Sequence, residues 1–164
     1  RELPLDTYIP GVTSRPEHDQ AEPADQRPAL TASPTAAWRD SEDYLWGRRL
    51  FHNGYYWEAH EVWERVWNAL GRHGPQADFI KGFIKLAAAG VKLGERNPKG
   101  VQRHLARAME LLQQSLGQLP ELKDRVQIED WRAFMDGAWS QTRIGLAPPS
   151  GQPKVLLPWL PRSD

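Results

Sequence analysis

Residues 51–67 read FHNGYYWEAHEVWERVW, and this stretch decides how the rest of the chain can fold. From Tyr55 onward it carries three acids, one histidine and five aromatic side chains. Asn53-Gly54 is typical of a helix end, so a new helix is predicted from about Tyr55 to Leu70. Aromatic residues along such a helix must pack into a core, and a carboxylate buried with them needs a partner or a proton. We therefore expect the candidate site on this helix.

A helical projection divides this predicted helix into two sides. The side expected to face the core holds Tyr56, Ala59, Trp63, Val66, Trp67 and Leu70. His60 and Glu64 are one helical turn apart at the edge of that side, and Glu61 points further out. Glu58 and Val62 are expected on the remaining side of the helix.

The spacing of His60 and Glu64 is compatible with a metal site. The two side chains can share one divalent ion such as zinc, as the two histidines of H-E-x-x-H do. A third ligand must then come from elsewhere in the chain, and His104, His52 and Asp78 are the candidates. His104 is preferred to His52 because it lies at the edge of an apolar helical stripe. The predicted metal ligands are therefore His60, Glu64 and His104.

Two interpretations of the same residues need no metal. In one, His60 and Glu64 relay a proton and Glu61 acts as general base, so that the protein hydrolyses a small substrate. The catalytic candidates in that case are His60, Glu61 and Glu64. In the other, the three side chains belong to a buried polar network, and the chain is a non-catalytic interaction or self-association module. The residues alone leave these alternatives open.

Four further helices are predicted around the central stretch. They cover about 41–53, 76–93, 98–119 and 129–142. The helix over 76–93 is apolar over more than a third of its circumference and rich in Gly and Ala, so we expect it at the centre of the fold. No alternating pattern of strands is present. The predicted fold is all-α: a compact bundle of about five helices forming a single domain over residues 38–145.

Proline-rich arms are predicted on both sides of the domain. Residues 1–37 contain six prolines and residues 146–164 contain five, too many for a lasting helix or a central strand. Apolar residues between Leu3 and Val12 surround a predicted turn at Pro10-Gly11. We expect that part of the first arm to lie on a surface, either of its own chain or of a partner.

The composition excludes several classes of chemistry. Lys and Arg (21) balance Asp and Glu (21), so no overall field attracts nucleic acid or an anionic membrane. Cysteine is absent, which rules out disulfides, thiol nucleophiles and cysteine-bound metals. No apolar run approaches the length of a membrane span. A cytoplasmic location is expected, with a small-molecule ligand or a second copy of the chain as candidate partner.

The sequence resembles a bacterial and archaeal family known as domain of unknown function 309. The resemblance rests on F-x-N-G-x-Y-W-E-A-H-E-x-W-E-x-x-W over residues 51–67, F-I-x-G-F-I-x-L-A-A over 79–88, N-x-x-G over 97–100 and Y-I-P-G over 8–11. It covers about residues 44–116. Lys81 and Lys85 replace glutamines common in that family, which could add positive charge near the acids.

The resemblance implies a small all-helical fold and a set of motif positions, without an established activity. The motif positions it marks are His60, Glu61 and Glu64, together with Asn53, Trp57 and Glu58 as residues lining a pocket.

Overall fold

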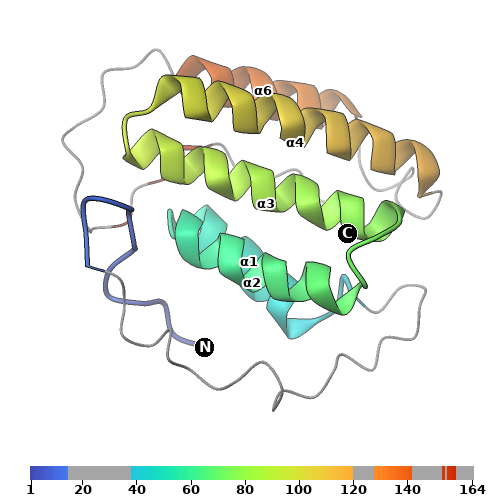
Figure 1. Cartoon of the computed structure of the whole chain (residues 1–164), viewed down its shortest axis with the longest axis horizontal. Helices are drawn as coiled ribbons and strands as arrows, with labels where there is room; N and C mark the ends of the chain where they lie inside the picture. Colours follow the sequence, from blue (N-terminus) through green and yellow to red (C-terminus); the bar gives the residue numbers. More distant parts are fainter. Residues whose placement is uncertain (15–37, 120–127, 142–152, 154, 158–164) are drawn as a thin grey trace.

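The computed structural model describes residues 1–14, 38–119, 128–141, 153 and 155–157. Five helices lie in this part of the chain: α1 (Glu42–His52), α2 (Tyr56–Ala69), α3 (Pro75–Gly94), α4 (Pro98–Gln118) and α6 (Ile128–Gln141). The described residues contain no strand. The prediction of an all-α bundle is confirmed, with helix boundaries within a few residues of those expected (Figure 1).

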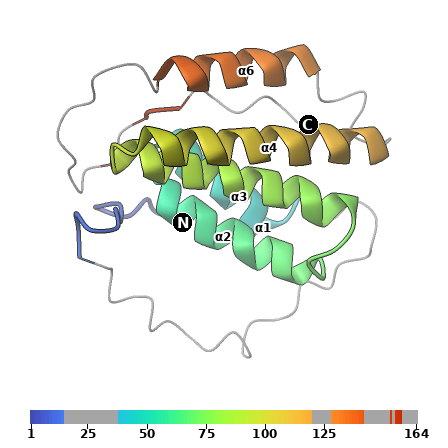
Figure 2. The same ribbon diagram turned by 45° about the horizontal axis from the view of Figure 1, so that its top comes forward.

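The helices pack in the order of the chain. α1 packs on α2, α2 on α3, α3 on α4, and α4 on α6 (Figures 1 and 2). Twelve of the twenty residues of α3 are buried, because this helix has neighbours on two opposite sides. The prediction that α3 is central is therefore confirmed. This central position matters for the candidate site, because α3 brings α2 and α4 together.

Polar side chains cap the starts of α1 and α4. The Ser41 hydroxyl accepts a hydrogen bond from the Tyr44 amide at 3.2 Å at the start of α1. The Asn97 side chain accepts one from the Gly100 amide at 2.9 Å at the start of α4, and Pro98 occupies the first helical position. These caps satisfy amides that have no partner inside the helix.

Glycines allow the helices to approach closely. A Cβ at Gly90 of α3 would overlap the ring of Tyr56 on α2. One at Gly82 would come within 2.8 Å of the Leu112 side chain on α4. The close packing expected from the small residues of α3 is present on both of its sides.

The buried side of α2 is wider than the predicted core-facing side. Val62 lies outside that predicted side, but its side chain is buried, only 5% exposed. α1 packs along that side, where Arg65 of α2 donates to the Asp43 carboxylate of α1 at 3.3 Å. A helix between two neighbours buries a wider arc than one that packs on a single surface.

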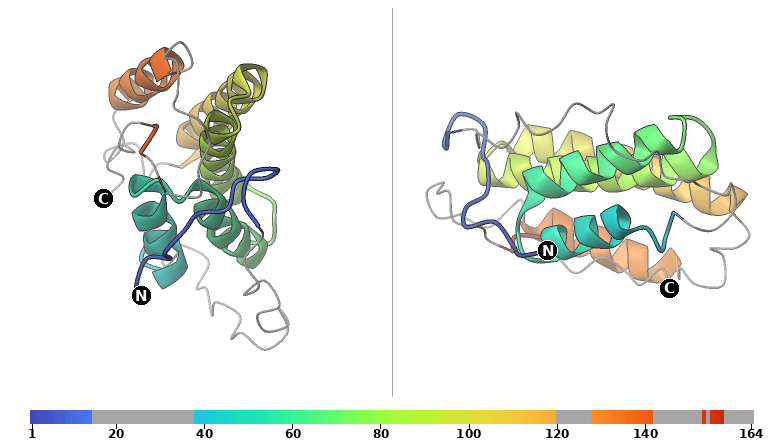
Figure 3. Two further views of the ribbon diagram at one scale, coloured as in Figure 1. Left: turned by 90° about the vertical axis from the view of Figure 1, so that its left-hand side faces the viewer. Right: turned by 90° about the horizontal axis from the view of Figure 1, so that it is seen from below.

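The arms are described only in part. Residues 15–37, which belong to the predicted first arm, and 142–152, 154 and 158–164, which include most of the predicted tail, lie outside the described residues. Residues 1–14 lie against the helices of their own chain (Figure 3). The turn predicted at Pro10-Gly11 is present, since the Val12 and Thr13 amides both donate to the Ile9 carbonyl at 3.0 Å. Within the described ranges, none of the helices has the combined length and apolar character needed to cross a bilayer.

Candidate functional site

His60 is held at the edge of α2 with one ring nitrogen enclosed. Its imidazole stacks on Trp57, one helical turn earlier, with ring centres 5.9 Å apart and planes inclined by 17°. Nδ1 is buried and has no hydrogen-bond partner in the described structure. Nε2 lies 3.9 Å from Glu64 Oε1, which is too long for a hydrogen bond. The expected pairing of His60 with Glu64 is therefore loose, and Glu64 is about half exposed.

Burial and nearby cations keep the histidines of this face neutral. Burial lowers the pKa of His60; the Glu64 carboxylate opposes this effect and the Lys85 ammonium adds to it. Burial, together with the charges of Lys85, Arg103 and Lys92, lowers the pKa of His104 to about 4. His60 on α2, Lys85 on α3 and His104 on α4 are thus close enough to influence one another, although they lie far apart in sequence.

The predicted metal ligands do not form a metal-binding group. Across the part of the chain that the structure describes, no three His, Asp or Glu side chains are placed to hold an ion together. His60 and His104 do share a face, but the charges around His104 are positive, which opposes a divalent cation. Glu64 Oε1 is 3.9 Å from His60 Nε2. The two side chains are therefore not already arranged as a pair of metal ligands.

Asn53 and Glu61, which were also predicted at the site, lie in surroundings that differ from those of His60. Asn53 forms the C-terminal cap of α1, and its side-chain amide donates to the Arg49 carbonyl at 2.7 Å. Its side chain is exposed and serves the helix end. Glu61 is partly buried on α2, beside His60 in sequence but 100° further around the helix.

Glu58 binds the N-terminal arm. One carboxylate oxygen accepts a hydrogen bond from the Thr7 hydroxyl at 2.8 Å, and the other accepts one from the Tyr8 amide at 2.9 Å. Thr7 is buried and Glu58 is partly buried, so the contact is shielded from water. Burial raises the pKa of Glu58, and these two hydrogen bonds oppose the rise. Glu58 is therefore a motif acid with two specific partners in the arm.

Three further contacts fix the arm on either side of Glu58. The Tyr8 ring meets Trp57 edge to face, with centres 4.7 Å apart. The Tyr55 hydroxyl donates to the Pro4 carbonyl at 2.6 Å. The buried Ile9 side chain lies against Gly94 at the end of α3; a Cβ there would be 3.3 Å from it. We call Tyr55, Trp57, Glu58 and Gly94 the arm receptor.

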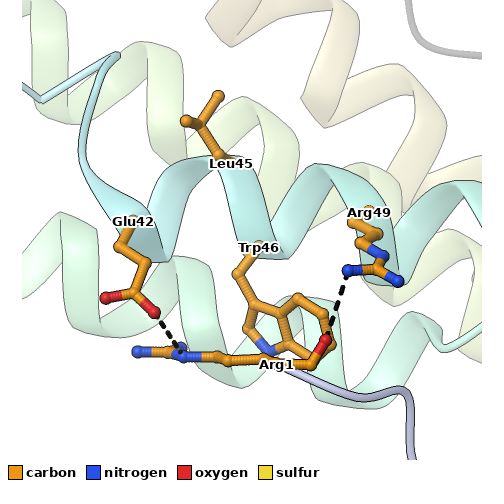
Figure 4. A pocket seen from close by; sticks show the side chains of 5 residues that line it. All are labelled: Arg1, Glu42, Leu45, Trp46 and Arg49. Atoms are coloured by element: carbon orange, nitrogen blue, oxygen red, sulfur yellow. Dashed lines mark hydrogen bonds and ion pairs between the residues drawn. The ribbon is translucent and has the colours of Figure 1, made fainter.

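Arg1, at the start of the arm, lines a hollow together with side chains of α1 (Figure 4). Arg1 Nε pairs with Glu42 Oε1 at 2.8 Å, and the Arg1 carbonyl accepts from the Arg49 guanidinium at 3.2 Å. The same guanidinium lies over the Trp46 ring, 5.5 Å from its centre. These side chains are largely solvent-exposed, so the contacts are weaker than those at Glu58.

The described structure defines a small all-helical domain with an extended segment docked on its own surface. Residues 44–104 match the model of the family described as domain of unknown function (DUF309), which confirms the resemblance found in the sequence. The chain matches no curated protein and no solved structure. The four residues of the arm receptor lie inside the matched region, whereas residues 1–14 lie outside it.

Sequence reasoning missed the role of Glu58. It placed this residue on the side of α2 away from the predicted core-facing residues and among the lining of a pocket, but its partners are about fifty residues away in the chain. The one available signal was the apolar run around Pro10-Gly11, which indicated that the arm packs on a surface. No local pattern connected that run with α2.

Proposed function

We propose that this protein is a non-catalytic interaction module whose arm receptor captures an extended polypeptide segment. Residues 4–13 are its ligand within the same chain. The observation that carries the proposal is the double hydrogen bond of Glu58, which recognises one backbone amide and one hydroxyl of the segment. A main-chain contact gives affinity for any extended segment, and the Thr7 hydroxyl adds selectivity.

The side chains of the arm complement the receptor at three positions. A hydroxyl residue meets Glu58, an aromatic residue meets Trp57, and a β-branched residue meets Gly94. The segment that fits is thus Thr-Tyr-Ile, followed by the Pro-Gly turn. The receptor belongs to the family domain and the ligand segment precedes it, as expected for a binding domain with a short linear ligand.

The catalytic interpretation has less support from the geometry. Catalysis by His60 and Glu64 needs a hydrogen-bonded pair, and their closest atoms are 3.9 Å apart. With Nδ1 enclosed, only Nε2 of His60 is placed to meet a substrate. By contrast, the contacts of Glu58 with Thr7 and Tyr8, on which the interaction module depends, are already at hydrogen-bond distance.

A nicked full-length chain tests the proposal. A site for a specific protease is placed within residues 24–30, the purified protein is cleaved there, and retention of the N-terminal fragment is measured by size-exclusion chromatography and mass spectrometry. The fragment should stay bound to the wild-type domain. A fluorescent peptide of residues 3–14, added in excess, should replace it.

Glu58→Ala supplies the decisive comparison. Hydrogen bonds to a charged group contribute about 1.5–3 kcal/mol each, so losing two should weaken peptide binding at least about a hundredfold. Glu110→Ala, an exposed acid of α4 that pairs with Arg107, is the charge-matched control and should retain the fragment. Release of the fragment from wild type, or equal retention by Glu58→Ala, would contradict the proposal. Light scattering of the uncut protein shows whether a second copy supplies the arm.

A further inference from the structure

Four consecutive residues at the start of α2 hold two segments that come from opposite sides of the helical domain in sequence. Three of the four belong to the arm receptor. The fourth, Tyr56, accepts hydrogen bonds from the Leu156 and Leu157 amides, at 2.8 and 2.9 Å. We call residues 155–157 the tail segment; its Leu157 side chain is buried. The arm and the tail segment lie at the same end of the bundle (Figures 1 and 2).

The two docking sites also meet on α3. The Tyr56 ring lies against Gly90, where a Cβ would overlap it, and the Ile9 side chain of the arm lies against Gly94. The two glycines are four residues apart, which is about one turn of an α-helix. Both Tyr56 and Ile9 are buried. The arm and the residue that binds the tail segment are therefore packed on adjacent turns of the same helix.

The first turn of α2 depends on these contacts because it lacks a local cap. In the part of the chain that the structure describes, the Tyr55 side chain at the N-cap position bonds no helix amide, and its hydroxyl donates to the Pro4 carbonyl of the arm. By contrast, α1 and α4 begin at capping side chains, those of Ser41 and Asn97. A helix start without such a cap frays more easily, so its order depends on packing against other segments.

We propose that the arm receptor and the tail segment are coupled, so that filling the receptor strengthens the docking of the tail segment, a form of regulation that rests on the proposed function. Each docked segment orders the same helical turn, and the other segment then docks without that cost. Such coupling is reciprocal, because a docked tail segment raises the affinity of the receptor by the same factor. Docking of the tail segment thus responds to the occupancy of the receptor.

The contacts also determine the sign of the coupling. Two segments that competed for one side chain would displace each other. The arm bonds Tyr55 and Glu58 whereas the tail segment bonds Tyr56, and no described side chain is hydrogen-bonded to both segments. Filling one site therefore favours filling the other.

Hydrogen exchange in the full-length protein, followed by NMR, tests the coupling. The amides of Tyr8, Leu156 and Leu157 are the reporters, since each donates to a bond that docking forms. Glu58→Ala should accelerate exchange at Tyr8, and through the coupling it should accelerate exchange of the two leucine amides about fivefold. Tyr56→Phe should accelerate the leucine amides and, about fivefold, the Tyr8 amide. In each variant, the segment that loses its own contact should respond more strongly.

Gly82→Ala is the control for general destabilisation. Its methyl crowds the Leu112 side chain on the α4 side of α3, away from the first turn of α2. Exchange of the three reporter amides should change less than about twofold, because docked segments exchange by local opening. Acceleration at both segments as large as in Glu58→Ala would overturn the proposal.

The outcomes in Glu58→Ala separate the coupling from the proposed function. Fast exchange at Tyr8 with unchanged exchange at Leu156 and Leu157 overturns the coupling and leaves the arm receptor supported. Unchanged exchange at Tyr8 contradicts the proposed function instead. Tyr56→Phe then decides the coupling: faster exchange at Tyr8 supports it, and unchanged exchange there overturns it.

Discussion

Thr7 and Glu58 are joined by a 2.8 Å hydrogen bond across 51 positions of the chain. The same carboxylate accepts the Tyr8 amide, so a motif acid on α2 holds an arm that precedes the helical domain. Tyr8 packs on Trp57 and Trp57 stacks on His60, so Trp57 contacts both the docked arm and the motif histidine.

Replacing Thr7 by valine should loosen the arm. Valine has the shape of threonine but no hydroxyl, so one Glu58 oxygen loses its partner in a buried contact. The expected loss is about 1.5–3 kcal/mol in the free energy of arm docking. Hydrogen exchange at the Tyr8 amide should accelerate accordingly. Ser14→Ala, at an exposed position further along the arm, is the control. Unchanged protection at Tyr8 would show that the hydroxyl does not hold the arm.

Glu58 should give an unusual contribution to the pH dependence of stability. Burial raises the pKa of its carboxyl above the ordinary value of 4.5, despite the hydrogen bonds from Thr7 and Tyr8. The folded protein therefore binds this proton more tightly than the unfolded chain, and protonation favours folding. Relative to Glu58→Gln, wild type should gain free energy of unfolding as the pH falls from 7 toward 4.5. Urea unfolding at several pH values measures this difference, and parallel curves for the two proteins would rule it out.

His104 should act in the opposite direction. Its pKa is lowered to about 4 by burial and by the charges of Lys85, Arg103 and Lys92, whereas an unfolded chain titrates near 6.5. The unfolded chain then takes up the proton first, so His104 removes stability as the pH falls from 6.5 through about 4. His104→Gln should flatten this part of the stability curve. His73→Gln, at an exposed loop position, should not. The same acid sensitivity in both variants would contradict the assignment.

The helices were predictable because their signals are local. Apolar periodicity and the caps at Ser41 and Asn97 each act within a few residues of the structure they determine. The central place of α3 followed from its composition for the same reason. The prediction failed at Val62, where burial depends on a neighbouring helix that a single-helix projection does not include.

The candidate site was predictable only as a location. The motif on α2 identified His60 and Glu58, but their chemistry depends on residues from other parts of the chain. The Thr7 hydroxyl offsets part of the cost of burying Glu58, and Lys85 of α3 adds to the lowering of the His60 pKa that burial causes. The net charge of zero also gave no indication of the cations around His104, because a total contains no information about position.

Tyr56→Phe should release the described part of the tail. The Tyr56 hydroxyl accepts the Leu156 amide at 2.8 Å and the Leu157 amide at 2.9 Å, and burial raises its pKa to about 12. Removing it leaves two amides without a partner, at a cost of about 1–3 kcal/mol each if they stay buried. Exchange should accelerate at Leu156 and Leu157. Tyr55→Phe is the matched control, because its hydroxyl bonds the Pro4 carbonyl and its loss should loosen the arm instead. Equal effects on both segments would contradict this division of roles.

Gly90→Ala and Gly117→Ala should change stability in opposite directions. The added methyl at Gly90 overlaps the Tyr56 ring, which is packed between α2 and α3. Overpacking of this kind costs about 1–3 kcal/mol, and displacing the ring also strains the bonds of its hydroxyl to the tail. At Gly117 nothing lies within 4 Å of the new methyl, so alanine should stabilise α4 by about 0.5–1 kcal/mol through its higher helix propensity. Thermal unfolding of the two variants measures both effects, and a stable Gly90→Ala protein would mean that the α2–α3 contact is less close than described.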